Sequence, residues 1–95
     1  MDLGASIDVP RRERLVRATT HAYLAWRRRC DATSDAYRRW ADAEEGDAQW
    51  EAWRAYELAL AGEKEASVSY VQLVERVADF EARGNELLIA SGGRR

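Results

Sequence analysis

The chain of 95 residues is divided near its midpoint by the stretch Glu44-Glu45-Gly46-Asp47. Its one proline is Pro10, so nothing breaks a helix for roughly 36 residues on either side of that stretch. Glycine readily adopts the left-handed conformation that ends many helices, and aspartate caps the start of the next helix. We therefore expect one helix over residues 9–45, a turn at 46–47 and a second helix over 48–83, which stops at Gly84. A short C-terminal turn is expected in the tail, residues 84–95.

Apolar and small residues recur at helical spacing in both halves of the chain. The stripe in the first half comprises Leu15, Thr19, Ala22, Trp26, Cys30, Thr33, Tyr37 and Trp40. The stripe in the second half comprises Trp53, Tyr56, Leu60, Ser67, Val71, Val74 and Ala78, widened by Trp50, Tyr70 and Val77. Steps of three and four residues average about 3.6, which is the period of an α-helix with one buried face. Gly62 interrupts the second stripe, either as a tolerated soft spot or as room for a bulky neighbour.

Composition restricts the class of protein. With 46% hydrophobic and 34% charged residues, the chain suits a single folded all-α domain rather than a disordered segment. A single cysteine excludes an internal disulfide framework and a zinc site with several cysteines. No stretch reaches the roughly 18 apolar residues of a membrane span, and the N-terminus lacks the features of a signal peptide. We therefore expect a cytoplasmic location, with leaderless export as the open alternative.

Charge is distributed unevenly between the two expected helices. Residues 8–40 carry nine arginines and four acids, a net charge of +5, whereas residues 41–91 carry twelve acids and four basic residues, a net charge of −8. In an antiparallel hairpin that turns at Gly46, facing residues have numbers that sum to about 92. This rule predicts four interhelical charge pairs: Arg11 with Glu81, Arg17 with Glu75, Arg27 with Glu65, and Arg29 with Glu63. Exposed pairs contribute only about 0–1 kcal/mol each, so they select the register more than they stabilise the fold.

Aromatic residues gather toward the turn, at Tyr37, Trp40, Trp50, Trp53 and Tyr56. A buried aromatic side chain hides roughly 150–250 Å², which is more than one facing helix can cover for all five. We expect this surface to be buried against a second copy of the chain, closing a four-helix bundle, or against another helical protein. The alternative is a monomer in which residues 87–89 fold back as a third element. The sequence thus predicts a coiled-coil-like helical hairpin, an antiparallel two-helix fold that acts as a non-enzymatic protein–protein interaction module: an adaptor, a regulator or a small assembly subunit.

The residue patterns that enzymes and metal sites require are missing from the sequence. His21 is the one histidine, and no acid lies at its height of the hairpin to orient it as a general base. Cys30 lies on the apolar stripe, where a cysteine is usually a small hydrophobe rather than a nucleophile. No Glu-x-x-His motif accompanies the carboxylates, and no phosphate-binding loop is present. We therefore expect no enzymatic activity, no cofactor, no metal and no small-molecule substrate.

A nucleic-acid-binding regulator is one alternative function. The runs Arg27-Arg28-Arg29 and Arg38-Arg39 lie among aromatic residues, as in proteins that track a phosphate backbone and stack bases. Consecutive arginines, however, spread over about 200° of a helix and do not form one stripe. The acidic second helix beside them would also repel a phosphate backbone, so nucleic acid is not the partner that we expect.

A second alternative rests on a resemblance. In its length and its two-helix layout with a central turn, the chain resembles the WXG100 proteins, small exported helical hairpins of actinobacteria. The turn of that family carries Trp-x-Gly, whereas Trp40 is followed here by Ala41 and Asp42. The tail of that family carries Tyr-x-x-x-Asp/Glu, whereas Tyr70 is followed here by Val74 at the fourth position. The resemblance implies a hairpin fold and an exported protein, and it transfers no functional residue to this sequence.

Overall fold

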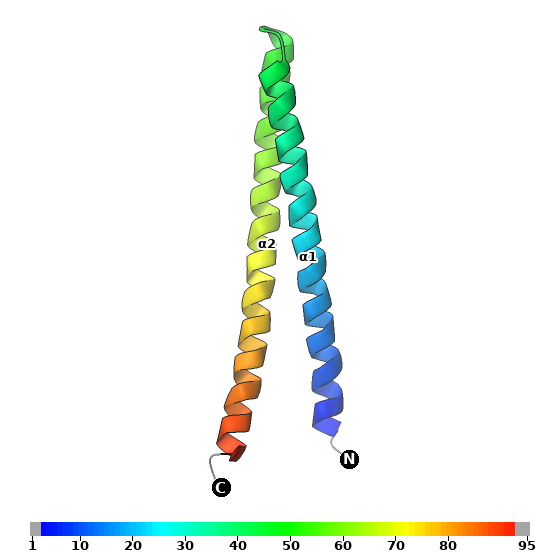
Figure 1. Ribbon diagram of the computed structural model, residues 1–95, viewed down its shortest axis with the longest axis vertical. Helices are drawn as coiled ribbons and strands as arrows, with labels where there is room; N and C mark the ends of the chain where they lie inside the picture. The colour runs from blue at the N-terminus through cyan, green and yellow to red at the C-terminus, as the bar shows by residue number, and fades with distance from the viewer. Residues whose placement is uncertain (1–2, 93–95) are drawn as a thin grey trace.

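Two long helices make up the described part of the chain. The computed structural model describes the backbone of residues 3–92 and the side chains of residues 10–85. Helix α1 spans Leu3–Asp42 and helix α2 spans Asp47–Gly92, and the two pack against each other. Figure 1 shows the turn at one end of the hairpin and both chain ends at the other. The expected antiparallel, all-α hairpin is therefore confirmed over these residues.

The connection between the helices begins earlier than expected. α1 ends at Asp42 rather than at residue 45, and residues 43–46 form the connection. The amide nitrogen of Ala43 lies 3.2 Å from the carbonyl oxygen of Trp40, a bond that tightens the last turn of α1. Gly46 has a φ of 115°, and its carbonyl accepts the first hydrogen bond of α2 from the amide of Trp50. The glycine therefore redirects the chain just before α2 rather than at the end of α1.

Both helices extend beyond their expected outer ends. α1 begins at Leu3, so Pro10 lies inside the helix instead of in its first turn. An interior proline costs about 3 kcal/mol, because it removes its own amide hydrogen bond and displaces one carbonyl, yet the turns on both sides of Pro10 are helical. α2 continues through Gly84, because a helical glycine costs only about 1 kcal/mol relative to alanine. The backbone of residues 87–89 thus prolongs α2 instead of folding back, and residues 93–95 of the expected tail lie outside the described part.

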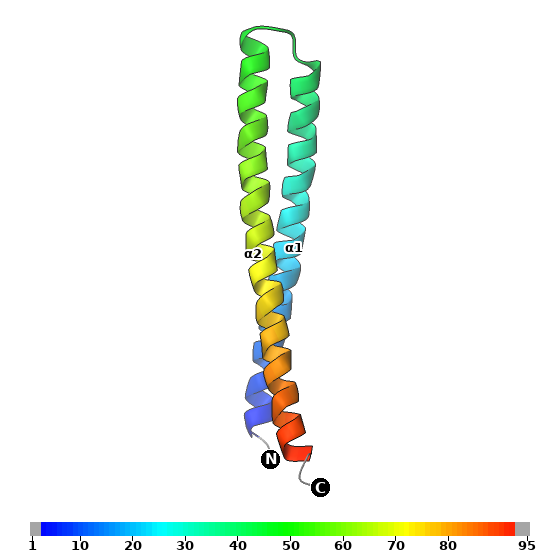
Figure 2. The same ribbon diagram turned by 90° about the vertical axis from the view of Figure 1, so that its left-hand side faces the viewer.

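The register of the hairpin follows a simple rule. Residues that meet across the seam have numbers that sum to 93, one more than the sequence suggested. The pairs that obey the rule are Arg12–Glu81, Tyr23–Tyr70, Cys30–Glu63, Tyr37–Tyr56 and Trp40–Trp53. Figure 2 shows the helices running alongside each other near the turn and crossing toward their outer ends. One continuous seam therefore sets the height of every residue in one helix relative to the other.

The seam is tightest in the half of α1 that lies nearer the turn. Thr33 and Ala36, each 8% exposed, are the most buried of the described side chains. The Thr33 hydroxyl lies 2.9 Å from the carbonyl oxygen of Arg29 in its own helix and 3.2 Å from that of Ala59 in α2. A side chain as short as threonine reaches the backbone of the other helix only where the two backbones approach closely. Small residues therefore define the closest contact between the two helices.

The buried stripe of α2 is displaced from the expected one. The partly buried residues that recur in steps of three and four are Gln49, Ala52, Tyr56, Ala59, Glu63, Ala66, Tyr70, Leu73, Val77 and Phe80. Leu60, Val71 and Val74, which were expected on the stripe, stay 41–50% exposed beside it. Alanines on the seam let α1 approach, and the larger apolar residues lie next to the contact rather than within it. On α1 the expected stripe is at least partly buried, except at Tyr37.

The hairpin is elongated and thin. Its principal extents are 74, 23 and 13 Å, and its radius of gyration is 21.4 Å. A compact domain of this length has a radius of gyration of about 12 Å. The accessible surface is 7955 Å², against about 5,500 Å² for a compact monomer of the same mass. None of the described side chains is fully buried, so a large apolar surface remains uncovered.

Replacing Gly84 with alanine tests the continuity of α2. A Cβ added at Gly84 meets no atom within 4 Å, so Gly84→Ala is expected to raise the free energy of unfolding by about 0.5–1 kcal/mol through helix propensity. Gly46→Ala is expected to lower it by about 1 kcal/mol or more, because alanine is strained at positive φ. Urea unfolding followed by circular dichroism measures both. A Gly84→Ala chain less stable than the parent would contradict a helical residue 84.

Candidate interaction surface

Two broad faces flank the seam, and each repeats every seven residues along both helices, as in a coiled pair. On one of them, four apolar or sulfur-containing residues come from α1 and five apolar residues come from α2, with polar residues between them. We call this the apolar face, and its residues are Val16, Tyr23, Cys30 and Tyr37 of α1 with Trp50, Trp53, Leu60, Val71 and Val74 of α2. A surface hollow joins Val16 of α1 to Val74 of α2, which places both helices' contributions on the same side.

The apolar face is poorly covered within the hairpin. Of the ten large hydrophobic residues that stay exposed in the described part, seven lie on this face. Their exposed fractions run from 38% at Val16 to 62% at Trp50. The other three, Leu24, Leu58 and Val68, lie outside the apolar face. Seven exposed large hydrophobic residues on one side are many for a chain of this size, since large apolar side chains are mostly buried in folded proteins.

The opposite face is lined mostly by short and charged side chains. One of its hollows is lined by short and charged side chains such as Ala25 and Ser69, and the other combines arginines such as Arg76 with Leu15, Leu73 and Phe80 of the seam. The side chain of Arg29 lies over Gly62, where an added Cβ would come within 3.3 Å of the guanidinium Nη1 and 3.6 Å of Cδ. Gly62 therefore makes room for a bulky neighbour, the second of the two interpretations of its position. The two faces of the hairpin are unlike, and only one offers a large apolar surface.

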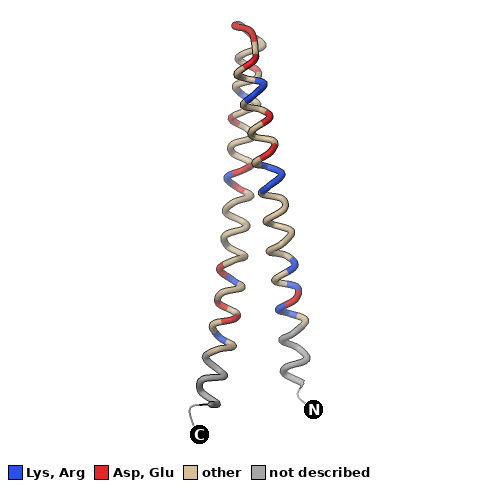
Figure 3. The backbone as a smooth tube through the Cα atoms, in the orientation of Figure 1, with Lys and Arg blue, Asp and Glu red and all other residues tan. Residues whose placement is uncertain are grey.

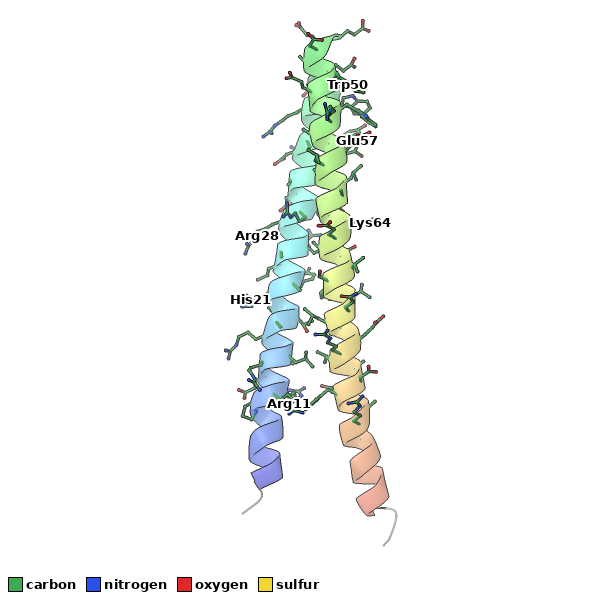
Figure 4. All side chains as sticks on the ribbon, turned by 180° about the vertical axis from the view of Figure 1, so that it is seen from behind. Arg11, His21, Arg28, Trp50, Glu57 and Lys64 are labelled. Atoms are coloured by element: carbon green, nitrogen blue, oxygen red, sulfur yellow. The ribbon has the colours of Figure 1, made fainter. Side chains whose placement is uncertain are left out.

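Near the turn, four of the five expected interaction residues pack on each other across the seam. The rings of Trp40 and Trp53 lie 4.9 Å apart, those of Tyr37 and Tyr56 lie 5.6 Å apart, and Trp40 and Tyr56 are stacked within 2°. This cluster joins α1 to α2 and supports the tip of the hairpin. Trp50 lines an open hollow beside Trp40 and Trp53 and is 62% exposed. Figure 4 shows it on α2, above Glu57 and Lys64.

A second aromatic cluster lies in the middle of the hairpin, where the sequence analysis singled out no interaction residue. Trp26 stacks on Tyr70 at 5.8 Å with the ring planes 8° apart, and Tyr23 lies 5.5 Å from Tyr70. Tyr23 is still 41% exposed on the apolar face. Figure 3 shows that both helices are free of charged residues at this height. The signal was available in the sequence, because Tyr23 precedes Tyr37 by two repeats of seven.

The described side chains form two salt bridges. Arg12 pairs with Glu81 at 2.8 Å across the seam, so Glu81 contacts the residue next to the expected Arg11. Arg38 pairs with Asp35 within α1 at 3.4 Å.

The other three expected pairs form no salt bridge among these side chains; they are Arg17–Glu75, Arg27–Glu65 and Arg29–Glu63. The sum of residue numbers predicts which residues lie at the same level of the two helices, but it ignores the direction in which each side chain leaves its helix. Arg29, for example, turns toward Gly62, and Glu63 instead accepts a hydrogen bond from Cys30.

Cys30 is partly buried at the edge of the seam. Its thiol donates a hydrogen bond to Glu63 Oε1 at 3.3 Å. Burial, the hydrogen bond and the charge of Glu63 raise the pKa of the Cys30 thiol above its usual value, although Arg27 acts in the opposite direction. A raised pKa keeps the sulfur protonated near neutral pH, and the thiolate is the nucleophilic form. The environment of Cys30 therefore opposes nucleophilic chemistry.

The remaining polar groups do not converge on a site. His21 is exposed, and Figure 4 shows it pointing away from α2. Within the described part, histidine, cysteine and acidic side chains nowhere gather in threes around a point that could hold a metal ion. In the same residues, neither helix contains an apolar stretch long enough to cross a bilayer. Among the described residues, the apolar face thus holds most of the exposed large hydrophobic side chains.

Comparison with known proteins returned no match: no family model, no curated protein and no solved structure corresponds to this chain.

The reactivity of Cys30 tests its contact with Glu63. At pH 8, below the raised pKa, Glu63→Gln is expected to increase the rate of alkylation by iodoacetamide severalfold, because a lower pKa enlarges the thiolate fraction. Glu65→Gln, which alters an exposed neighbouring acid, serves as the matched control and should leave the rate unchanged. Mass spectrometry at the lowest practical protein concentration measures the rate. Equal rates for Glu63→Gln and the parent would contradict the influence of the Glu63 carboxylate on the thiol.

Proposed function

We propose that the chain is a non-enzymatic protein–protein interaction module whose apolar face docks on a second helical hairpin to close a four-helix bundle. The observation that carries the proposal is the exposure of seven large hydrophobic residues on one broad face, while the hollows of the opposite face are lined mostly by short and charged side chains. A four-helix bundle is the common closed arrangement for amphipathic hairpins, because each helix then has two neighbours instead of one.

The surface area of the hairpin supports this proposal. The chain exposes 7955 Å², about 2,400 Å² more than a compact monomer of its mass. Burial of apolar surface contributes roughly 25 cal/mol per Å² before the costs of association are subtracted. Covering the apolar face is therefore a large favourable term that the isolated hairpin does not use.

The aromatic residues near the turn divide into two roles in this proposal. Trp40, Trp53 and Tyr56 hold the two helices together and give the tip a fixed shape. Trp50 and Tyr37, which are 62% and 49% exposed, are the anchors that enter the partner. Tryptophan and tyrosine are frequent among the few residues that dominate binding energy. A rigid cluster beneath them lowers the entropy lost on docking.

Two tryptophan variants separate the interface from the hairpin. Trp50→Ala is expected to weaken association roughly tenfold or more and to change the stability of the isolated hairpin by less than about 0.5 kcal/mol. Trp53→Ala is expected to lower the free energy of unfolding by about 2–3 kcal/mol, because its ring packs on Trp40 and Tyr56. Sedimentation equilibrium measures association, and urea unfolding at low concentration measures stability. A strict monomer with blue-shifted Trp50 emission would contradict the proposal, since the face would then be covered within the chain.

A further inference from the structure

The apolar face carries a self-complementary pattern, which identifies both the partner and its orientation. On α2 the residues at the same heptad positions as the apolar face recur in steps of three and four, like a second seam. They are Trp50, Trp53, Glu57, Leu60, Lys64, Ser67, Val71, Val74, Ala78 and Glu81. The corresponding residues of α1 are Glu13, Val16, Thr20, Tyr23, Arg27, Cys30, Ser34, Tyr37 and Ala41. A 3-4 repeat is the pattern that packs side chains between neighbouring helices of a bundle.

We propose that the second hairpin is another copy of this chain, stacked face to face and antiparallel, with the twofold axis beside Leu60. This inference rests on the proposed function, because it names the occupant of the apolar face. In such a dimer the two turns point in opposite directions, α1 lies over α1 of the partner, and α2 lies over α2 of the partner. The contact is isologous, so each residue meets its counterpart reflected through the axis.

The positions of the α2 residues on this side are symmetric about that axis. Glu57 and Lys64 have numbers that sum to 121, and so do Trp50 and Val71. An axis between Leu60 and Ala61 therefore places Glu57 against Lys64 of the second copy, twice, and Trp50 against Val71 of the second copy, twice. Leu60 then meets its own counterpart at the centre. Lys64 is the one lysine of the chain, and Figure 4 shows it on the same helix as Glu57 and Trp50.

The α1 pattern agrees with the same axis independently. Because heights across the seam sum to 93, an axis at Leu60 crosses α1 near Thr33, where facing residues have numbers that sum to about 65. Tyr23 then meets the small Ala41 of the second copy. Arg27 meets the ring of Tyr37, a favourable cation–π arrangement. Both helices are thus complementary in one register.

The parallel arrangement is opposed by charge. With both turns at the same end, α1 lies over α2 of the second copy, and residues whose numbers sum to 93 face each other. Arg27 then lies near Lys64 of the second copy, and Glu13 lies near Glu81 of the second copy. Each like-charge contact occurs twice, and such contacts between neighbouring helices select against an orientation. The antiparallel stack avoids both.

The size of the antiparallel overlap is that of a stable interface. It runs from the turn to about residue 73 of α2, some 26 residues, or about 39 Å at 1.5 Å per residue. With a hairpin width of 23 Å, the footprint is roughly 800–900 Å² per copy, which matches a standard specific interface. The outer ends of both helices, including Val16 of the apolar face, extend beyond the overlap.

Charge reversal tests the register. Glu57→Lys and Lys64→Glu each create like-charge contacts twice and are expected to weaken the dimer roughly tenfold. An equimolar mixture of the two variants restores both opposite-charge contacts and is expected to form a heterodimer with close to parental affinity. Glu65→Lys, a reversal outside the apolar face, is the matched control and should leave the dimer intact. Sedimentation equilibrium measures all four samples.

Cross-linking tests the position of the axis. In a Cys30→Ser background, Leu60→Cys is expected to give a disulfide-linked dimer under mild oxidation, because the two side chains meet at the axis. Leu58→Cys, at a position 74% exposed outside the apolar face, is the control and should stay unlinked. The inference would be overturned if the parental chain dimerises but mixing the two charge variants restores no affinity and Leu60→Cys forms no cross-link. The proposed function would then still stand. A parental chain that stays monomeric but binds another helical protein through Trp50 would have the same two consequences.

Discussion

A helix in a two-helix hairpin has one neighbour, so it can bury one stripe of its surface and no more. Everything else in this structure depends on how that single contact is used. The chain fills it with alanines, threonine and stacked rings, and Thr33 reaches the backbone of α2 at its tightest point. Close approach through small residues holds the helices in one register but buries little area. The larger side chains are left beside the contact, where they form the apolar face.

Several features of this arrangement were readable from the sequence. Helical spacing and the lone break at residues 44–47 predicted two antiparallel helices, and the position of Gly46 predicted the register to within one residue. These features are local or follow from counting along the chain. The outer helix ends were less predictable, because Pro10 and Gly84 each weaken a helix by an amount that neighbouring turns can outweigh. Pro10 and Gly84 each favour a helix end locally, but neither residue alone determines where the helix ends.

The direction of each side chain was the main quantity that counting could not supply. The expected stripe of α2 followed the largest apolar residues, whereas the seam runs through Ala52, Ala59 and Ala66. The apolar residues of α2 form two adjacent rows along the helix. Hydrophobicity alone does not say which of the two rows packs against α1. Unknown side-chain directions also explain why the expected charge pairs did not form as predicted, since Glu81 contacts Arg12 rather than Arg11. Size matters as much as polarity, because a close contact between backbones requires short side chains.

The narrow, continuous seam also determines how the hairpin loses its structure. Each height of the seam contacts only the heights next to it, so its stability approaches a sum of nearest-neighbour terms. Separation can begin at the open ends and travel inward without a large rearrangement, while the turn and the aromatic cluster above it stay closed. Amide protons should consequently exchange with solvent in a gradient along each helix, fastest near the outer ends and slowest around Thr33 and Ala36. The helices should therefore separate first at their outer ends and last at the turn.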